Sequence, residues 1–160
     1  MTMSIQDNQQ VDTLLDKIAR TATATSAWLR TGHTHFERAL NLNLGAWTDG
    51  VHTYTAEVSN DGSAVLKVLD ETELVSSVDT DVSVDGEVIV SDATRDDSIL
   101  HLDVLHYAEY FRIVQTVTGG PGTGLVSGAE AISAGPRHAG GQGQPASILG
   151  MTRNNPSIIG

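Results

Sequence analysis

Apolar and polar residues alternate over several short segments of this chain, the pattern of half-buried β-strands. In residues 51–59, His52, Tyr54, Ala56 and Val58 fall on one side of an extended backbone and the intervening residues on the other. Turn-forming sequences such as Asp49-Gly50 and Asn60-Asp61-Gly62 separate these segments. Strands are expected at residues 26–31, 34–44, 51–59, 63–69, 82–90, 98–105, 107–118 and 125–134, with a loop or short helix at 70–79. Strands of this spacing predict an all-β domain, a β-sandwich or a barrel.

The N-terminal segment has a different period. Val11, Leu14, Leu15 and Ile18 fall at i, i+3, i+4 and i+7, which places them on one stripe of a helix. We therefore expect a short amphipathic helix over about residues 8–20, capped by Asp7 or Asn8. Its apolar stripe has two possible places, against its own domain or against a partner.

Composition changes near the other end of the chain. The predicted strands 107–118 and 125–134 enclose Gly119–Gly124 and form a long hairpin that stops at Pro136. Residues 139–160 are rich in Gly, Gln, Ser, Asn and Pro and contain two apolar islands, Ile148, Leu149 and Met151, then Ile158 and Ile159. The segment is either a disordered tail or an arm that docks on a neighbouring subunit; we favour the arm. The expected organisation is 1–20, an N-terminal helical segment; 21–138, the β-sandwich domain; and 139–160, an extended C-terminal arm.

The net charge of the chain excludes some classes of binding partner. The chain has 20 acidic and 9 basic residues and a net charge of −11, so a nucleic-acid backbone would be repelled. No apolar run reaches the ~20 residues that span a bilayer, and the N-terminus lacks the pattern of a signal peptide. We expect a protein made in the cytoplasm that binds neither membrane nor nucleic acid. An acidic, lysine-poor composition is also typical of adaptation to high salt, although a well-solvated surface is the simpler explanation.

Three segments resemble ligand-binding sites, but each lacks a feature that such a site requires. His33 and His35 would share a strand face, with His52, His101 or His106 as a possible third metal ligand. Residues 79–87 are acidic but have Val84 where a calcium loop of the EF-hand type needs glycine. The glycines of 119–124 lead into a strand and not into the helix that a phosphate loop requires. With no cysteine and no nucleophile motif, we expect no metal, no cofactor and no catalysis.

Several short motifs in a fixed order suggest a family. Gly45-Ala46-Trp47-Thr48-Asp49-Gly50 is followed by Ser59-Asn60-Asp61-Gly62, by Tyr110-Phe111-Arg112, and by Pro136-Arg137-His138. In this order, over about residues 20–138, the chain resembles small β-rich virion structural proteins of tailed viruses, of the capsid decoration or turret type. The resemblance implies a β-sandwich subunit on the capsid surface whose partners are the major capsid protein and copies of itself. The predicted helix and the segment after His138 lie outside the resemblance, where attachment elements would be added.

The sequence thus predicts a non-enzymatic virion subunit that attaches to the shell and oligomerises around a symmetry axis. Its interaction residues are expected to be Val11, Leu14, Leu15, Ile18, Ile148, Leu149, Met151, Ile158 and Ile159. The alternative is a tail or fibre component that binds a host-surface glycan. That alternative requires the aromatic side chains to converge on one exposed surface, namely those of Trp28, Trp47, Tyr54 and Tyr107.

Overall fold

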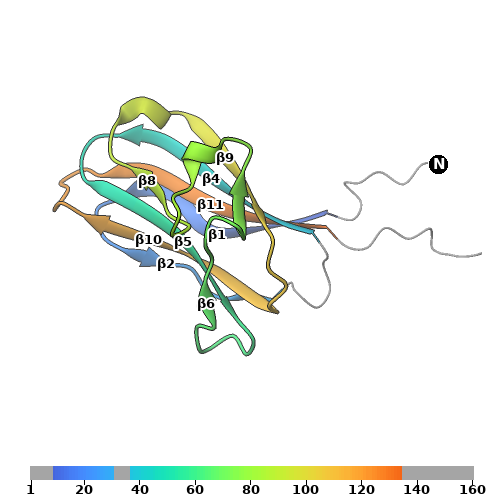
Figure 1. Cartoon of the computed structure of the whole chain (residues 1–160). Coiled ribbons are helices and arrows are strands. Elements are labelled where there is room, and N and C mark those ends of the chain that lie inside the picture. The colour runs from blue at the N-terminus through green and yellow to red at the C-terminus, as the bar shows by residue number, and fades with distance from the viewer. Residues whose placement is uncertain (1–8, 31–36, 135–160) are drawn as a thin grey trace, which may run out of the picture. The chain divides into compact units, whose positions relative to one another are not determined.

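A computed structural model describes residues 9–30 and 37–134 of the chain. Residues 10–134 form one compact unit made of two antiparallel β-sheets that pack face to face as a sandwich (Figure 1). The prediction of an all-β sandwich is therefore confirmed. The C-terminal arm predicted at 139–160, with its apolar islands, lies outside the described residues.

The first sheet has five strands in the order β1-β11-β4-β9-β7. Their bounds are β1 Gln9–Arg20, β11 Leu125–Ala134, β4 Glu37–Trp47, β9 Ser98–Val104 and β7 Leu74–Ser76. The long strand β4 lies at the centre, with Leu42 opposite Ala129 of β11 on one side and Leu100 of β9 on the other. Strands β1 and β7 are the two edges of this sheet.

The second sheet is built on the pair β10 Tyr110–Thr118 and β5 Val51–Ser59, which are in register over all nine residues. Two short strands, β2 Ala24–Thr25 and β3 Leu29–Arg30, pair with the free side of β10. Two others, β6 Lys67–Val68 and β8 Val88–Val90, pair with the free side of β5. Strands β1, β2 and β3 thus form the edges on one side of the sandwich. Strands β7, β6 and β8 form the edges on the opposite side.

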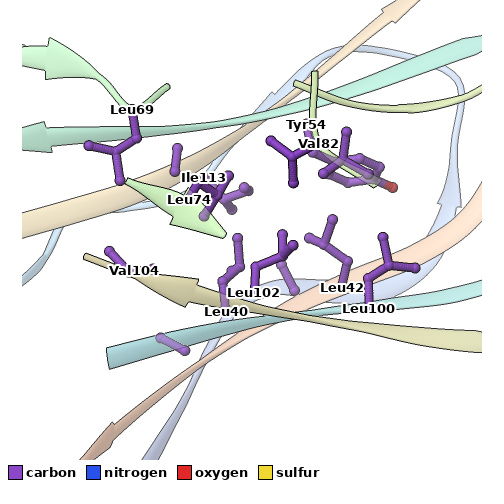
Figure 2. Close-up of a cluster of buried hydrophobic side chains, with 14 of the residues drawn as sticks. Leu40, Leu42, Tyr54, Leu69, Leu74, Val82, Leu100, Leu102, Val104 and Ile113 are labelled. Carbon is purple, nitrogen blue, oxygen red and sulfur yellow. The ribbon is translucent and has the colours of Figure 1, made fainter. Parts of the chain in front are cut away.

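The core lies between the sheets and follows the predicted alternation (Figure 2). In β5 the residues His52, Tyr54, Ala56 and Val58 are buried, as their period of two predicts. Leu40, Leu42 and Leu102 of the first sheet are fully buried opposite them. Because only two phenylalanines are present, aliphatic side chains supply most of the buried apolar surface.

The predicted N-terminal helix is wrong: residues 9–20 form the edge strand β1. The four apolar residues do not share a face, because Leu15 is buried and Leu14 partly buried, while Val11 and Ile18 are 58% and 52% exposed. Strand β11 leaves one row of backbone groups to be paired, and β1 pairs with it. The helical spacing is therefore coincidental, and β1 belongs to the same unit as the other strands.

The shorter predicted strands were only partly correct. Of residues 63–69 only Lys67–Val68 is a strand, and of 82–90 only Val88–Val90. The segment 70–79, predicted as a loop or short helix, contains the strand β7 and leads into the short 3-10 helix η2 Asp79–Asp81. A second 3-10 helix, η3 Ala93–Arg95, precedes β9.

Candidate interaction surface

The structure distributes the predicted interaction residues over both sides of strand β1. Leu15 packs in the core and contributes to holding β1 on the sheet, whereas Val11 and Ile18 are exposed. The other five predicted residues, in 148–159, lie outside the described part of the chain. What the structure adds is the strand itself. β1 has twelve residues, about 40 Å at the usual rise per residue, and one edge that no described strand pairs with.

Two glycines, one in β11 and one directly before it, allow β1 to lie close to this strand. A Cβ at Gly128 would come within 2.9 Å of the Leu15 carbonyl oxygen, and one at Gly124 within 1.9 Å of the Arg20 carbonyl oxygen. Gly124 also has a φ of 80°, in the left-handed region that other residues rarely adopt. As residue numbers rise along β11, the neighbouring numbers fall along β1, so the two strands run antiparallel.

The cations of β1 are bonded to neutral groups. Lys17 Nζ donates to Asn43 Oδ1 at 3.0 Å, and the Arg20 guanidinium donates to the backbone oxygen of Asp16. By contrast, Arg30, Lys67, Arg95 and Arg112 each form an ion pair with a carboxylate. Lys17 and Arg20 have no such pair within the described residues. We call β1 with β2 and β3, residues 9–30, the β1 margin; it carries three basic and two acidic residues.

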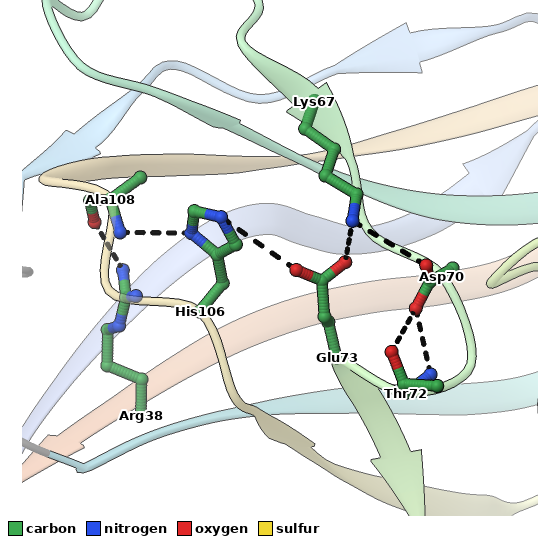
Figure 3. Close-up of polar contacts among 7 residues, drawn as sticks. All are labelled: Arg38, Lys67, Asp70, Thr72, Glu73, His106 and Ala108. Atoms are coloured by element: carbon green, nitrogen blue, oxygen red, sulfur yellow. Dashed lines mark hydrogen bonds and ion pairs between the residues drawn. The ribbon is translucent and has the colours of Figure 1, made fainter.

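The opposite edges of the sandwich are acidic. Residues 69–87, which we call the acidic margin, contain seven acidic residues and no basic one. A cation from outside the segment neutralises part of this charge: Lys67 Nζ lies 2.6 Å from Glu73 Oε1 and 3.6 Å from Asp70 Oδ2 (Figure 3). Arg95 likewise pairs with Asp81 at 2.5 Å. Glu71, Asp85 and Glu87 form no ion pair with the described residues.

A polar network fixes the acidic margin to the body of the sandwich (Figure 3). The second carboxylate oxygen of Glu73 lies 3.8 Å from His106 Nε2, and His106 Nδ1 accepts a hydrogen bond from the Ala108 backbone N–H at 3.0 Å. The Ala108 carbonyl in turn accepts from Arg38 Nη1 at 3.1 Å. Burial lowers the pKa of Arg38, which stacks over the Phe111 ring at 5.4 Å. These groups bond to one another and so hold Glu73 against the loop before β10.

Exposed aliphatic residues occur on both margins. The β1 margin has Val11 and Ile18, and the acidic margin has Val78 and Val84, which are 52% and 70% exposed. A shallow depression of about 530 Å³ lies beside Val78 and is lined by β7, η2 and the start of β9. Protein contact surfaces commonly have apolar side chains at the centre and polar or charged residues around them.

The glycine-rich segment is a turn between two strands, as predicted, but the hairpin expected of these strands is wrong. Strand β10 pairs with β5 in the second sheet and β11 pairs with β4 in the first, so the turn crosses from one sheet to the other. Strand β10 ends at Thr118, β11 begins at Leu125, and both Gly119 and Gly120 have a positive φ. The Asp49 carboxylate accepts hydrogen bonds from the N–H groups of Gly122, Thr123 and Gly124. These bonds, that from Gly124 first, lower the pKa of Asp49. The amide groups that might have held a phosphate are therefore bonded to a carboxylate of the same chain.

The other candidate ligands do not converge. His33 and His35 lie outside the described residues; His52 is buried with its Nδ1 3.2 Å from Gln115 Nε2, and His101 bonds Asn41. Within the described ranges, no group of three or more His, Cys, Asp or Glu side chains is placed to hold a metal ion. The part of the chain that the structure describes also contains no helix with the length and hydropathy needed to cross a bilayer.

The four aromatic residues of the glycan-binding alternative also lie apart. Tyr54 is in the core, where burial raises its pKa to about 12. Trp47 packs against the core and donates from Nε1 to the Gly50 carbonyl at 3.0 Å. Trp28 stacks under Arg112 on the second sheet, and Tyr107, in the loop before β10, is 72% exposed. The common aromatic surface that this alternative needs is absent from these four residues.

Comparisons with known proteins give only a weak likeness of fold. No family model matches the chain, and no curated protein matches it. A solved structure that resembles it is that of the SPBc2 prophage-derived protein YomS, with a TM-score of 0.43 and 14% sequence identity. The alignment covers 78% of this chain and 91% of that one.

Proposed function

We propose that this protein is a non-enzymatic structural subunit of a tailed-virus particle, attached to the major capsid protein on the shell and oligomerised around a symmetry axis. The ordered motifs of residues 20–138 support the class of protein. One observation in the structure supports the subunit role: the long edge strand β1 carries exposed Val11 and Ile18, and no described strand pairs with one of its sides. A monomer that functions alone would usually shorten or cover such an edge.

The organisation of the polar groups is consistent with a structural role. The best-connected polar groups, those around Glu73 and Asp49, bond to their own chain and strengthen the sandwich. The arm at residues 139–160 stays a prediction: its islands Ile148, Leu149, Met151, Ile158 and Ile159 would dock on a neighbouring subunit. Attachment by many weak contacts on a symmetric shell needs no single deep pocket.

The experiment that tests this proposal locates the protein on intact particles. An antibody raised against the purified chain is used for immunogold labelling of purified virus, and the particles are imaged by cryo-electron microscopy. We expect label on the capsid shell and extra density at its symmetry axes. Label on the tail alone would favour the fibre alternative, and absence of the protein from particles would refute both.

A further inference from the structure

The two margins of the sandwich are complementary in charge. The β1 margin, residues 9–30, has a net charge of +1, and the acidic margin, residues 69–87, has −7. Counting the ion-pair partners Glu109, Lys67 and Arg95, the first is neutral and the second has −5. The chain has an overall charge of −11, so most surfaces of two copies would repel each other. A margin without excess negative charge is therefore unusual in this molecule. A second copy would thus meet least repulsion where its acidic margin faces β1.

The margins are also placed at opposite edges of the same sheet. The order β1-β11-β4-β9-β7 puts β1 at one edge and β7, which lies within the acidic margin, at the other. Apolar side chains accompany the charges on both: Val11 and Ile18 on one, Val78 and Val84 on the other. A contact between unlike edges is heterologous, so it passes from copy to copy in one direction. It gives a ring when the rotation between successive copies closes, and an open filament when it does not.

We propose that copies of this chain associate edge to edge, with the β1 margin of one copy bound to the acidic margin of the next. Lys17 and Arg20, the described cations of β1 that lack a carboxylate partner, face Glu71, Asp85 and Glu87, which lack a cation. The exposed aliphatic residues of the two margins pack together. This inference deepens the proposed function, since it names the surfaces through which subunits would surround a symmetry axis.

The segment 69–87 is firm enough to act as one surface. A Cβ at Gly86 would lie 1.9 Å from the Leu69 carbonyl oxygen, so the turn 83–87 packs directly on the start of the segment. Within that turn, Ser83 N–H donates to the Glu87 carbonyl at 2.9 Å and Gly86 N–H to the Ser83 carbonyl at 2.8 Å. Asp85 and Val84 are therefore presented on a closed turn, and ordering them on contact costs little additional entropy.

The test is a pair of matched double variants of the full chain, studied by sedimentation velocity at 0.15 M sodium chloride. Lys17→Glu with Ile18→Glu alters the β1 margin, and Val84→Lys with Asp85→Lys alters the acidic margin. We expect wild type to form a closed oligomer and each variant to sediment as a monomer. Circular dichroism and thermal melting verify that both variants remain folded, as the exposure of all four residues predicts.

Mixing the two variants distinguishes this contact from a symmetric one. Each variant keeps one intact margin, so an equimolar mixture should recover association, with 1:1 complexes as the smallest unit. A contact of β1 with β1 would instead leave the Val84→Lys, Asp85→Lys variant oligomeric by itself. That result would overturn the proposal, and so would oligomers of the Lys17→Glu, Ile18→Glu variant or a monomeric wild type.

The control variant changes the same kinds of residue away from both margins. Ser63→Lys with Val65→Lys alters two exposed side chains of the segment between β5 and β6, outside both margins, and should leave the oligomer unchanged. Loss of the oligomer in this control would show that net charge, and not the margins, governs association. Particle imaging is independent of this experiment: a monomeric protein found on the shell would refute the edge contact alone, and an oligomer absent from particles would refute the function alone.

Discussion

At the scale of single residues, Asp49 shows how one side chain fixes two turns. It precedes Gly50 in the turn between β4 and β5, and its carboxylate binds the three N–H groups at the end of the β10–β11 turn. Gly50 completes the contact, because a Cβ there would lie 2.8 Å from the Pro121 ring. The Asp49-Gly50 pair identifies a turn from the sequence alone, but its partner turn, over seventy residues later, is visible only in the fold.

Asp49 should make stability depend on pH. Its pKa is lowered in the folded state, so its contribution is fully present above the unfolded value of about 3.9 and is lost as the pH falls through the folded pKa. We expect Asp49→Asn to melt at a lower temperature than wild type at pH 7. The difference between the two proteins should shrink as the pH is lowered below 4. Melting curves followed by circular dichroism measure this, and a constant difference down to pH 2 would contradict it.

At the scale of elements, β1 is where reasoning from the sequence failed. The pattern of Val11, Leu14, Leu15 and Ile18 fits a helix, and local periodicity contains no information about the unpaired edge of β11. The nearest signal was Gly128, a glycine within a strand, which often marks the close approach of another backbone. In the fold, that backbone is β1.

Gly128→Ala should loosen β1 from the sheet. The added methyl group would lie 2.9 Å from backbone atoms of Leu15 and Lys17, which cannot move without shifting the strand. Overpacking of this kind costs about 1–3 kcal/mol. We expect a lower melting temperature, and faster hydrogen exchange at amides of residues 9–20 than elsewhere.

Gly122→Ala, in the turn before β11, is the matched control for Gly128→Ala. Its methyl group would meet Asp49 Oδ2 at 3.8 Å, an ordinary contact, and Gly122 does not have a positive φ. Its effect on stability should lie within about 0.5 kcal/mol. Equal effects of the two substitutions would mean that β1 does not lie against Gly128.

The elements that could be predicted were those whose residues define them locally. Strand β5 has an alternating face and a turn signal at each end, and β11 lies between a glycine turn and Pro136, so both were predicted with their observed bounds. The short strands β6, β7 and β8 have too few residues to show an alternation of apolar and polar positions. The candidate surface was found only in part, because the charge difference between residues 9–30 and 69–87 becomes meaningful once the sheet order places them on opposite edges.

At the scale of the whole molecule, the distribution of charge is uneven. All 20 acidic residues lie between positions 7 and 130, whereas residues 135–160 contain two arginines and no acid. Within the described residues, four of the basic side chains are paired with carboxylates, so most of the acids have no cationic partner there. The folded unit therefore repels itself at low ionic strength.

Thermal stability should rise with salt for this reason. The Debye length shortens from ~30 Å at 0.01 M to ~8 Å at physiological ionic strength, which weakens repulsion between surface acids. We expect the melting temperature of the chain to increase from 0.01 M to 1 M sodium chloride, measured by differential scanning calorimetry. A flat or falling melting temperature would show that the acids serve solubility alone.

The antiparallel pairing of β1 with β11 also determines how the subunit responds to force. Gln9 and Ala134 lie at the same end of two neighbouring strands, so a load applied through them falls first on the terminal bridge and peels β1 away pair by pair. A load applied across the sheet, from the β1 margin to the acidic margin, is instead shared by all the bridges between each pair of strands. The first sheet is thus weak against a pull that separates Gln9 from Ala134 and stronger against a load spread across it, the direction in which a ring of subunits would be stretched.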